Sequence, residues 1–280
     1  MLPAVGLRAV EGRVGSTLLM QFLASSPEVV LDRRYPHGEY RYLSYCSRAA
    51  SFLTEPWRPG VDPGVTELFF GEARRFGPLP FEPESLELGD LEQRALAHLW
   101  SACSEAMLDW QPSARWYAEK LAVPAQPIVD AGIPLRLIDC VRDPRDVLVS
   151  IRAFTAATGV DGFGRRAAEP EAEYLPRFIT AFAQQLDDLA ATPPSVNRIT
   201  LRYEDFATDP DTTADRLGEW LGLTLDPGVA TRSRREFPHH LTTPSVEASI
   251  GRWRRGLAAR EADTIWEGLG SRLEPYGYTR

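Results

Sequence analysis

Two short apolar segments, each running directly into a helix, constrain the fold of this chain more than any other feature of its sequence. Residues Ala4–Val10 are mostly apolar and lead through a glycine-containing turn into a helical pattern over Ser16–Ala24. Residues Leu135–Val141 are also mostly apolar, and a helix follows from Pro144, because proline fits the first turn of a helix. Buried strands that feed helices in this way predict an α/β fold with a mostly parallel sheet flanked by helices.

The remaining segments continue this alternation. We expect short strands at Val29–Leu31, Trp116–Tyr117 and Arg198–Leu201, and helices in the longer amphipathic stretches, which are Tyr40–Leu53, Leu91–Trp110, Glu171–Ala191, Thr212–Leu221 and Arg260–Leu273. The helix from Pro144 is expected to end near Ala153, and residues 155–170 are glycine-containing and predict a mobile loop.

Residues 55–89 are rich in proline and glycine, with one short helix expected near Thr66–Arg75. Apolar side chains persist there, so we interpret this stretch as an insertion rather than a linker. The whole chain, residues 1–280, is then expected to form one domain.

Charge and composition exclude several classes of protein. The net charge of −8 argues against a general nucleic-acid binder, although it leaves room for a local basic pocket. No apolar run reaches the ~18 residues of a membrane-spanning helix, and a cleaved signal peptide would remove Gly12–Thr17, so we expect a cytoplasmic protein. The three cysteines show no metal-binding spacing, so zinc and structural disulfides are not expected. The sequence leaves the oligomeric state open.

Lys120 is the only lysine among 31 basic residues, all others being arginine. Codon bias can replace surface lysines by arginine at little cost, but not where a compact ammonium is required. Lys120 is therefore a candidate for a specific role, while chance survival on the surface remains the alternative.

The turn Gly12–Thr17 follows the first strand and opens a helix. Glycines let such a turn fold closely around an anion, and the free amides of a helix start donate hydrogen bonds to it. The hydroxyls of Ser16 and Thr17 add donors, and Arg13 adds charge. A nucleotide-triphosphatase loop, G-x-x-x-x-G-K-[ST], would place a lysine after Gly15, where Ser16 stands, so use of ATP or GTP is disfavoured. A glycine turn without a ligand remains possible for so short a motif.

The second strand-to-helix junction carries Arg142-Asp143-Pro144-Arg145-Asp146, with Ser150 about two helical turns beyond Arg142. Arg142 and Ser150 can therefore converge on one anion at the strand's carboxyl end, where ligands bind in parallel sheets. The alternative is a salt-bridged strand end with a buried serine.

These two strings resemble the 5′-phosphosulfate loop and the 3′-phosphate motif of the sulfotransferase family, of the bacterial type. Gly12 and Val14 depart from the family's usual proline and serine. Two further strings agree, one at Tyr203, which resembles a tyrosine lying against adenine, and one at Ser249–Arg254, which resembles a segment closing over the nucleotide.

The resemblance implies a P-loop-like sulfotransferase architecture, 3′-phosphoadenosine-5′-phosphosulfate (PAPS) as donor, adenosine 3′,5′-bisphosphate (PAP) as product, and a small-molecule acceptor bearing a hydroxyl or an amine. The cofactor-binding residues it implies are Gly12, Arg13, Val14, Gly15, Ser16, Thr17, Arg142, Ser150, Tyr203, Gly251, Arg252, Trp253 and Arg254.

The catalytic groups follow from the same resemblance. Arg13 and Lys120 are expected to stabilise charge on the transferring group, and Glu39, with His37 as the alternative, is expected to take the acceptor's proton. Glu39 could equally form an ordinary salt bridge with a neighbouring arginine. No cluster of carboxylates in the sequence requires a metal, so none is expected. Five aromatic residues could line an apolar acceptor pocket or belong to the core: Tyr35, Tyr40, Tyr42, Tyr45 and Trp57.

Two other functions remain open on the sequence alone. A P-loop-like kinase of a small molecule would need the loop lysine that is missing here. An inactive relative that binds PAP without turnover would be compatible with the same anion-binding motifs.

Overall fold

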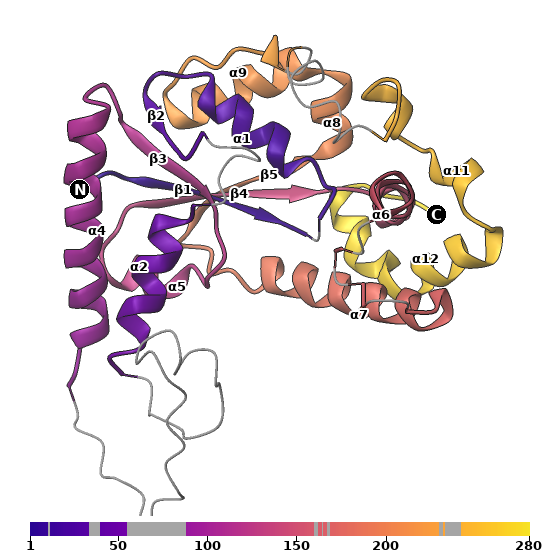
Figure 1. Ribbon diagram of the computed structural model, residues 1–280, viewed down its shortest axis with the longest axis horizontal. Coiled ribbons are helices and arrows are strands. Elements are labelled where there is room, and N and C mark those ends of the chain that lie inside the picture. Colours follow the sequence, from indigo (N-terminus) through magenta and orange to yellow (C-terminus); the bar gives the residue numbers. More distant parts are fainter. Residues whose placement is uncertain are drawn as a thin grey trace, which may run out of the picture.

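The alternating pattern folds into one five-stranded sheet in which every adjacent pair of strands is parallel (Figure 1). The computed structural model describes residues 1–10, 12–33, 40–54, 88–159, 162–163, 165–166, 169–229, 232 and 242–280. The strand order is β2-β3-β1-β4-β5. The strands are β1 (Ala4–Ala9), β2 (Val29–Val30), β3 (Trp116–Lys120), β4 (Leu135–Val141) and β5 (Asn197–Arg202).

Helices cover both faces of this sheet, as its burial pattern requires. One core cluster joins the sheet to α1, α6, α7, α9 and α12, and a second joins it to α2, α4 and α5. The longer helices are α1 (Ser16–Ala24), α2 (Tyr42–Ser51), α4 (Leu91–Trp110), α6 (Pro144–Thr158), α7 (Glu171–Ala190), α9 (Pro210–Leu221) and α12 (Ala259–Leu273). The short ones are α5 (Gln126–Asp130), α8 (Tyr203–Thr208), α11 (Trp253–Gly256) and the 3₁₀ turns η2 (Glu247–Ser249) and η3 (Glu274–Tyr276).

Local chemistry accounts for the helix starts that the sequence predicts. The Asp143 carboxylate accepts a hydrogen bond from the Arg145 amide at 2.9 Å and so caps α6, with Pro144 in its first turn. The Asp209 carboxylate caps α9 in the same way, through the Thr212 amide at 3.0 Å. The predicted bounds of α1, α4 and β4 are confirmed.

Three predictions about elements need correction. Helix α6 continues past Ala153 to Thr158, because the chain keeps helical residues until Gly159, which takes the left-handed conformation with φ of 69°. The predicted loop therefore begins later than residue 155. Strand β3 runs on to Lys120, and the short helices α5, α8 and α11 were not predicted. The expected helix near Thr66–Arg75 lies outside the described residues.

Because all five strands are parallel, their carboxyl ends meet at one edge of the sheet. This edge carries the turn after β1, Lys120 at the end of β3, Arg142 after β4 and Tyr203 after β5. Among the described residues, no helix is both long enough and apolar enough to cross a membrane.

Candidate anion site and adjoining cavity

The turn between β1 and α1 has the conformation of an anion-binding loop. Arg13 and Gly15 both have left-handed backbones, with φ of 67° and 92°, and Gly15 is the N-cap of α1. The N-cap residue, Gly15, has no side chain that could cap the first-turn amides of α1, which have no intrahelical acceptor. A Cβ on Gly15 would lie 2.5 Å from Cδ2 of Tyr203, so glycine is required there by space as well as by φ.

Gly12 and Val14, where the sequence departs from the family pattern, have separate explanations. A Cβ at Gly12 would lie 2.1 Å from Cδ1 of Phe163, so the packed ring excludes any larger residue. The side chain of Val14 is fully buried in the core, so only its backbone can face a cofactor.

Arg142 connects three segments at the sheet edge. Its Nη1 donates to the carbonyl of Arg13 at 2.8 Å, and its Nη2 donates to the carbonyl of Ser249, also at 2.8 Å. Its guanidinium lies over the ring of Tyr203, 4.1 Å from the ring centre. The side chain is almost fully buried, yet its Nε has no hydrogen-bond partner within the described part of the chain. Such an orphaned donor is unusual and fits a ligand oxygen.

Ser150 joins the same group through Arg13. The Ser150 hydroxyl accepts a hydrogen bond from Nε of Arg13 at 3.2 Å and lies 3.4 Å from the hydroxyl of Thr242. Arg252 donates to the Thr242 hydroxyl at 3.0 Å and to the carbonyl of Val149 at 3.0 Å. The predicted pair, Arg142 and Ser150, is thus brought together through a third residue, since each contacts Arg13.

Positive charge is concentrated here. Burial, together with the nearby charge of Arg142, lowers the pKa of Arg13 to about 10. Burial and the same neighbouring charge also lower the pKa of Arg252. Cations that lower one another's pKa values in a partly buried place favour the binding of an anion.

Asp146 fixes the C-terminal segment against this site. Its carboxylate accepts hydrogen bonds from the amides of Gly251, at 2.6 Å, and Trp253, at 2.8 Å. Burial raises its pKa to about 6. The backbone of Gly251 is left-handed, with φ of 64°.

The second arginine of the motif has a structural role. Arg145 pairs with Asp143 through two hydrogen bonds and lies 3.9 Å from the ring centre of Trp253. Arg254 is exposed, and its guanidinium lies over the same Trp253 ring, 4.6 Å from the ring centre. Trp253 thus contacts Asp146 through its amide, and its ring contacts both Arg145 and Arg254.

Lys120 ends β3 beside the same turn. Its Nζ donates to the hydroxyl of Thr17 at 3.3 Å, and β3 pairs with β1 at Leu7. The only lysine of the chain is therefore at the anion-binding loop rather than isolated on the surface.

Glu119, next to Lys120, was not predicted to matter. Its carboxylate is fully buried and accepts hydrogen bonds from the Leu43 amide at 2.9 Å, the Ser44 amide at 3.0 Å and the Tyr117 hydroxyl at 2.7 Å. Burial raises its pKa, and these hydrogen bonds oppose that rise. Glu119 thereby anchors the start of α2 and explains why that helix begins at Tyr42 rather than Tyr40. The signal in the sequence that could have indicated this role is a carboxylate within a strand whose neighbouring residues are buried, because a buried carboxylate needs hydrogen-bond partners.

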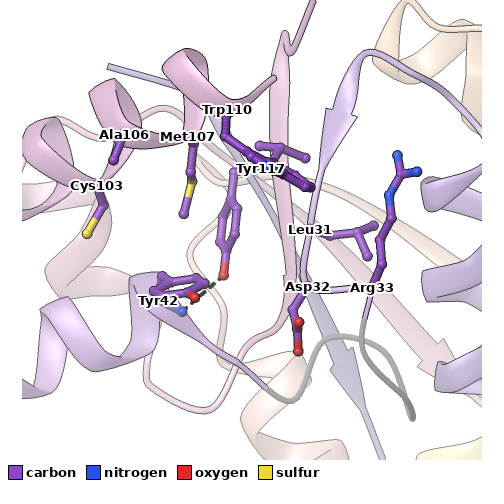
Figure 2. Close-up of a pocket in the computed structure, with 10 residues that line it drawn as sticks. Leu31, Asp32, Arg33, Tyr42, Cys103, Ala106, Met107, Trp110 and Tyr117 are labelled. Atoms are coloured by element: carbon purple, nitrogen blue, oxygen red, sulfur yellow. Dashed lines mark hydrogen bonds between the residues drawn. The ribbon is translucent and has the colours of Figure 1, made fainter. Parts of the chain in front are cut away.

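A cavity of about 600 Å³ lies between α4 and the edge strand β2 (Figure 2). It is lined by Val30, Leu31, Asp32, Arg33, Tyr42, Cys103, Ala106, Met107, Trp110 and Tyr117. Of the five aromatic residues that could line a pocket or belong to the core, Tyr42 lines this cavity. Tyr45 is 54% exposed and Tyr40 is 44% exposed, and neither lines the cavity. Tyr35 and Trp57 lie outside the described residues, as do the candidate bases Glu39 and His37. Within the described part of the chain, no group of three or more His, Cys, Asp or Glu side chains is placed to hold a metal ion.

The model of the sulfotransferase family matches residues 11–227. The chain belongs to the sulfotransferase family. No curated protein matches the chain.

Solved structures agree on the fold. The sulfotransferase domain of the olefin synthase of Synechococcus PCC 7002 is 15% identical, with a TM-score of 0.53, and the match covers 100% of this chain and 97% of that one. The sulfotransferase domain from the curacin biosynthetic pathway is 17% identical, with a TM-score of 0.50 and coverage of 96% and 98%. Mouse sulfotransferase SULT7A1, complexed with PAP, is 12% identical, with a TM-score of 0.51 and coverage of 97% and 85%. The predicted α/β fold and family are thereby confirmed.

Proposed function

We propose that this sulfotransferase uses PAPS as its donor and transfers the sulfuryl group to a hydroxyl, or an amine, of a small-molecule acceptor. The observation that carries the proposal is the group of Arg13, Arg142 and Arg252, in which Arg142 is buried, Arg13 and Arg252 are half-buried, and the Nε of Arg142 lacks a partner within the described chain. Two phosphate-containing groups on one nucleotide would supply the oxygens and the negative charge that this arrangement favours.

The cofactor roles follow from the contacts. The first-turn amides of α1 and the Arg13 side chain would hold the 5′ group, and Arg142 with Ser150 would hold the 3′-phosphate. Tyr203 is proposed to face the adenine. One face of its ring already carries the Arg142 guanidinium, and its hydroxyl lies 2.9 Å from that of Ser249, so the ring is fixed before any ligand arrives. When bound, PAPS supplies an activated sulfuryl group next to a phosphate leaving group.

The protein's own side chains would then stabilise charge on the transferring group and take the proton of the acceptor. Lys120, held beside Thr17, is proposed to stabilise charge on the transferring group together with Arg13. Glu39 is proposed to take the acceptor's proton, with His37 as the alternative. In support, the segment that contains both runs between Arg33, at the cavity, and Tyr40, whose amide donates to Asp32 at 3.3 Å.

Calorimetry with two nucleotides tests the cofactor assignment. PAP should bind more tightly than AMP, and Arg142→Ala should weaken PAP binding by about 1.5–3 kcal/mol, the usual cost of losing a hydrogen bond to a charged group. Arg255→Ala, which removes an exposed arginine near the same segment, is the matched control and should bind PAP like the wild type. Equal affinity of the wild type for PAP and AMP would defeat the assignment.

Parallel incubation with PAPS and with ATP distinguishes sulfuryl transfer from phosphoryl transfer. We expect PAP to form from PAPS, no ADP to form from ATP, and turnover to persist in excess EDTA. Activity that disappears in EDTA and returns with magnesium would instead support a kinase. Tight PAP binding without turnover of any acceptor would support an inactive relative.

A further inference from the structure

The cavity between α4 and β2 has the size and the lining of a small-molecule site. Its volume of about 600 Å³ falls within the usual range of roughly 300–1,000 Å³ for such sites. Eight of its ten lining residues carry apolar, aromatic or thiol side chains, and Asp32 and Arg33 are the charged exceptions. Figure 2 shows α4 contributing Cys103, Ala106, Met107 and Trp110 from one side, while Leu31, Asp32 and Arg33 come from the segment after β2, with the side chains of Leu31 and Arg33 directed away from α4.

The charged end of the cavity points toward the reactive edge of the sheet. Strand β2 pairs with β3 in parallel, with Val30 opposite Tyr117. Asp32 and Arg33 follow Val30 in the same direction in which Glu119 and Lys120 follow Tyr117. An apolar molecule in the cavity can therefore direct a polar group toward the edge at which Lys120 meets the anion-binding loop.

The aromatic walls are fixed in place. The Tyr117 hydroxyl donates to Glu119 at 2.7 Å and accepts from the Tyr42 amide at 3.0 Å, so Tyr117 offers its ring rather than its hydroxyl. The rings of Tyr42 and Tyr117 lie 6.4 Å apart in an edge-to-face arrangement. Trp110 is 66% exposed at the end of α4, which leaves a large aromatic surface available to a ligand. Met107 adds a polarizable sulfur, which packs favourably against aromatic rings.

We propose that this cavity binds the apolar, aromatic body of the acceptor, with the acceptor's hydroxyl at the Asp32–Arg33 end. The proposal rests on the proposed function and narrows it, because it selects hydroxylated aromatic compounds over sugars. A sugar needs many hydrogen bonds, and the cavity walls other than Asp32 and Arg33 supply few groups to make them.

Cys103 allows the cavity to be tested without any turnover. It is half-buried and lines the cavity, whereas Cys46 and Cys140 are buried. Saturating 2-naphthol should slow labelling of Cys103 by N-ethylmaleimide at least fivefold, as followed by mass spectrometry of the peptide, and glucose should leave the rate unchanged. Equal labelling rates with and without 2-naphthol would overturn the proposal. This readout is independent of PAPS, so it stands even if the proposed function fails.

Filling the cavity provides a second test. Ala106→Trp places an indole at the lining, and Ala102→Trp, one turn earlier on α4 and outside the lining, is the matched control. With PAPS as donor, Ala106→Trp should raise the KM for 2-naphthol at least tenfold and remove the protection of Cys103, with PAP affinity unchanged. Ala102→Trp should behave like the wild type in all three measurements. A KM and a degree of protection that are the same in both variants would contradict the proposal; loss of PAP binding would point to misfolding, and Met107→Trp, judged by the same criteria, would then decide.

Discussion

The arginine group and the cavity lie on either side of β3 and are built from opposite chemistry. The arginine group is cationic, with Arg142 buried and Arg13 and Arg252 half-buried, and hydrogen bonds of 2.8–3.2 Å hold these side chains to their neighbours. The cavity is mostly apolar, and Asp32 and Arg33, the charged residues among the described ones that line it, are at one end. A rigid polar site can recognise one ligand closely, because every displaced donor leaves a buried group unsatisfied. An apolar site discriminates less, since shape and area contribute most of its binding free energy. This difference suits a fixed donor and a variable acceptor.

Lys120 stands at the end of β3, the strand that separates the two regions, so its removal is expected to have the largest effect. Lys120→Ala should lower kcat by roughly 10²-fold or more, comparable to the loss of one oxyanion donor, and should leave PAP binding nearly unchanged. Lys120→Arg should restore only part of the activity, because a planar guanidinium cannot occupy the position of a compact ammonium beside Thr17. Single-turnover kinetics measures this, and full activity in Lys120→Arg would show that the lone lysine is an accident of composition.

The pH dependence of stability in a variant of Asp146 tests the polar region. Its pKa is raised by burial to about 6, above the ~3.9 of an unfolded aspartate, so its contribution to stability is present at low pH and is lost as pH rises through about 6. The unfolding free energy of Asp146→Asn relative to the wild type should therefore rise by about 2 kcal/mol between pH 4 and pH 7. Urea unfolding across this range measures the difference.

Asp187 provides the control for that pH series. Its pKa is lowered by the hydrogen bonds from Arg272 on the surface, so its contribution to stability is lost as pH falls. Asp187→Asn should show a weak trend of the opposite sign. A difference between wild type and Asp146→Asn that stays constant from pH 4 to pH 7 would contradict the burial argument.

Substitution of Ser150 tests whether the arginine group and the cavity act independently, with a smaller expected effect on binding. Ser150→Ala removes the hydroxyl next to Arg13 and should weaken PAP binding by about 1–1.5 kcal/mol, about tenfold, with no change in labelling protection at Cys103. Calorimetry measures the PAP affinity, and thiol labelling of the same sample measures the protection of Cys103. If protection at Cys103 changed along with PAP affinity, the two regions would be coupled rather than separate.

The smallest effect is expected in the aromatic wall. Tyr42→Ala should raise the KM for 2-naphthol a few-fold, because it removes a lining ring but keeps the backbone amide that donates to Tyr117. Tyr45→Ala should leave the KM unchanged, since Tyr45 is exposed and does not line the cavity. Steady-state kinetics with PAPS compares them, and equal effects would assign Tyr45 to the site as well.

The polar region was more predictable from the sequence than the cavity. Arg13, Arg142 and Ser150 lie in short local strings at strand-to-helix turns, and chain geometry alone brings such turns to one edge of a parallel sheet. The cavity depends on the position of α4 beside β2, and 60 residues, 31–90, separate these two elements in the sequence. No local pattern distinguishes Met107 or Trp110 from ordinary helix-face residues. The role of Glu119 was missed for the same reason, because its partners Leu43 and Ser44 are distant in sequence.

The alternation of side chains along β3 has an evolutionary consequence. Tyr117 and Glu119 point to the face of α2 and the cavity, whereas Ala118 packs with the α1 side and Lys120 contacts Thr17 there. Each of these four residues therefore contacts only one face of the sheet. Substitutions that reshape the cavity wall can therefore accumulate without displacing the lysine, and a lineage of such enzymes can change what it sulfates while keeping its donor chemistry. A one-residue shift in the pairing of β3 would move the cavity-side residues to the α1 face and the α1-side residues to the cavity face. The register of this strand must therefore be preserved while the cavity wall changes.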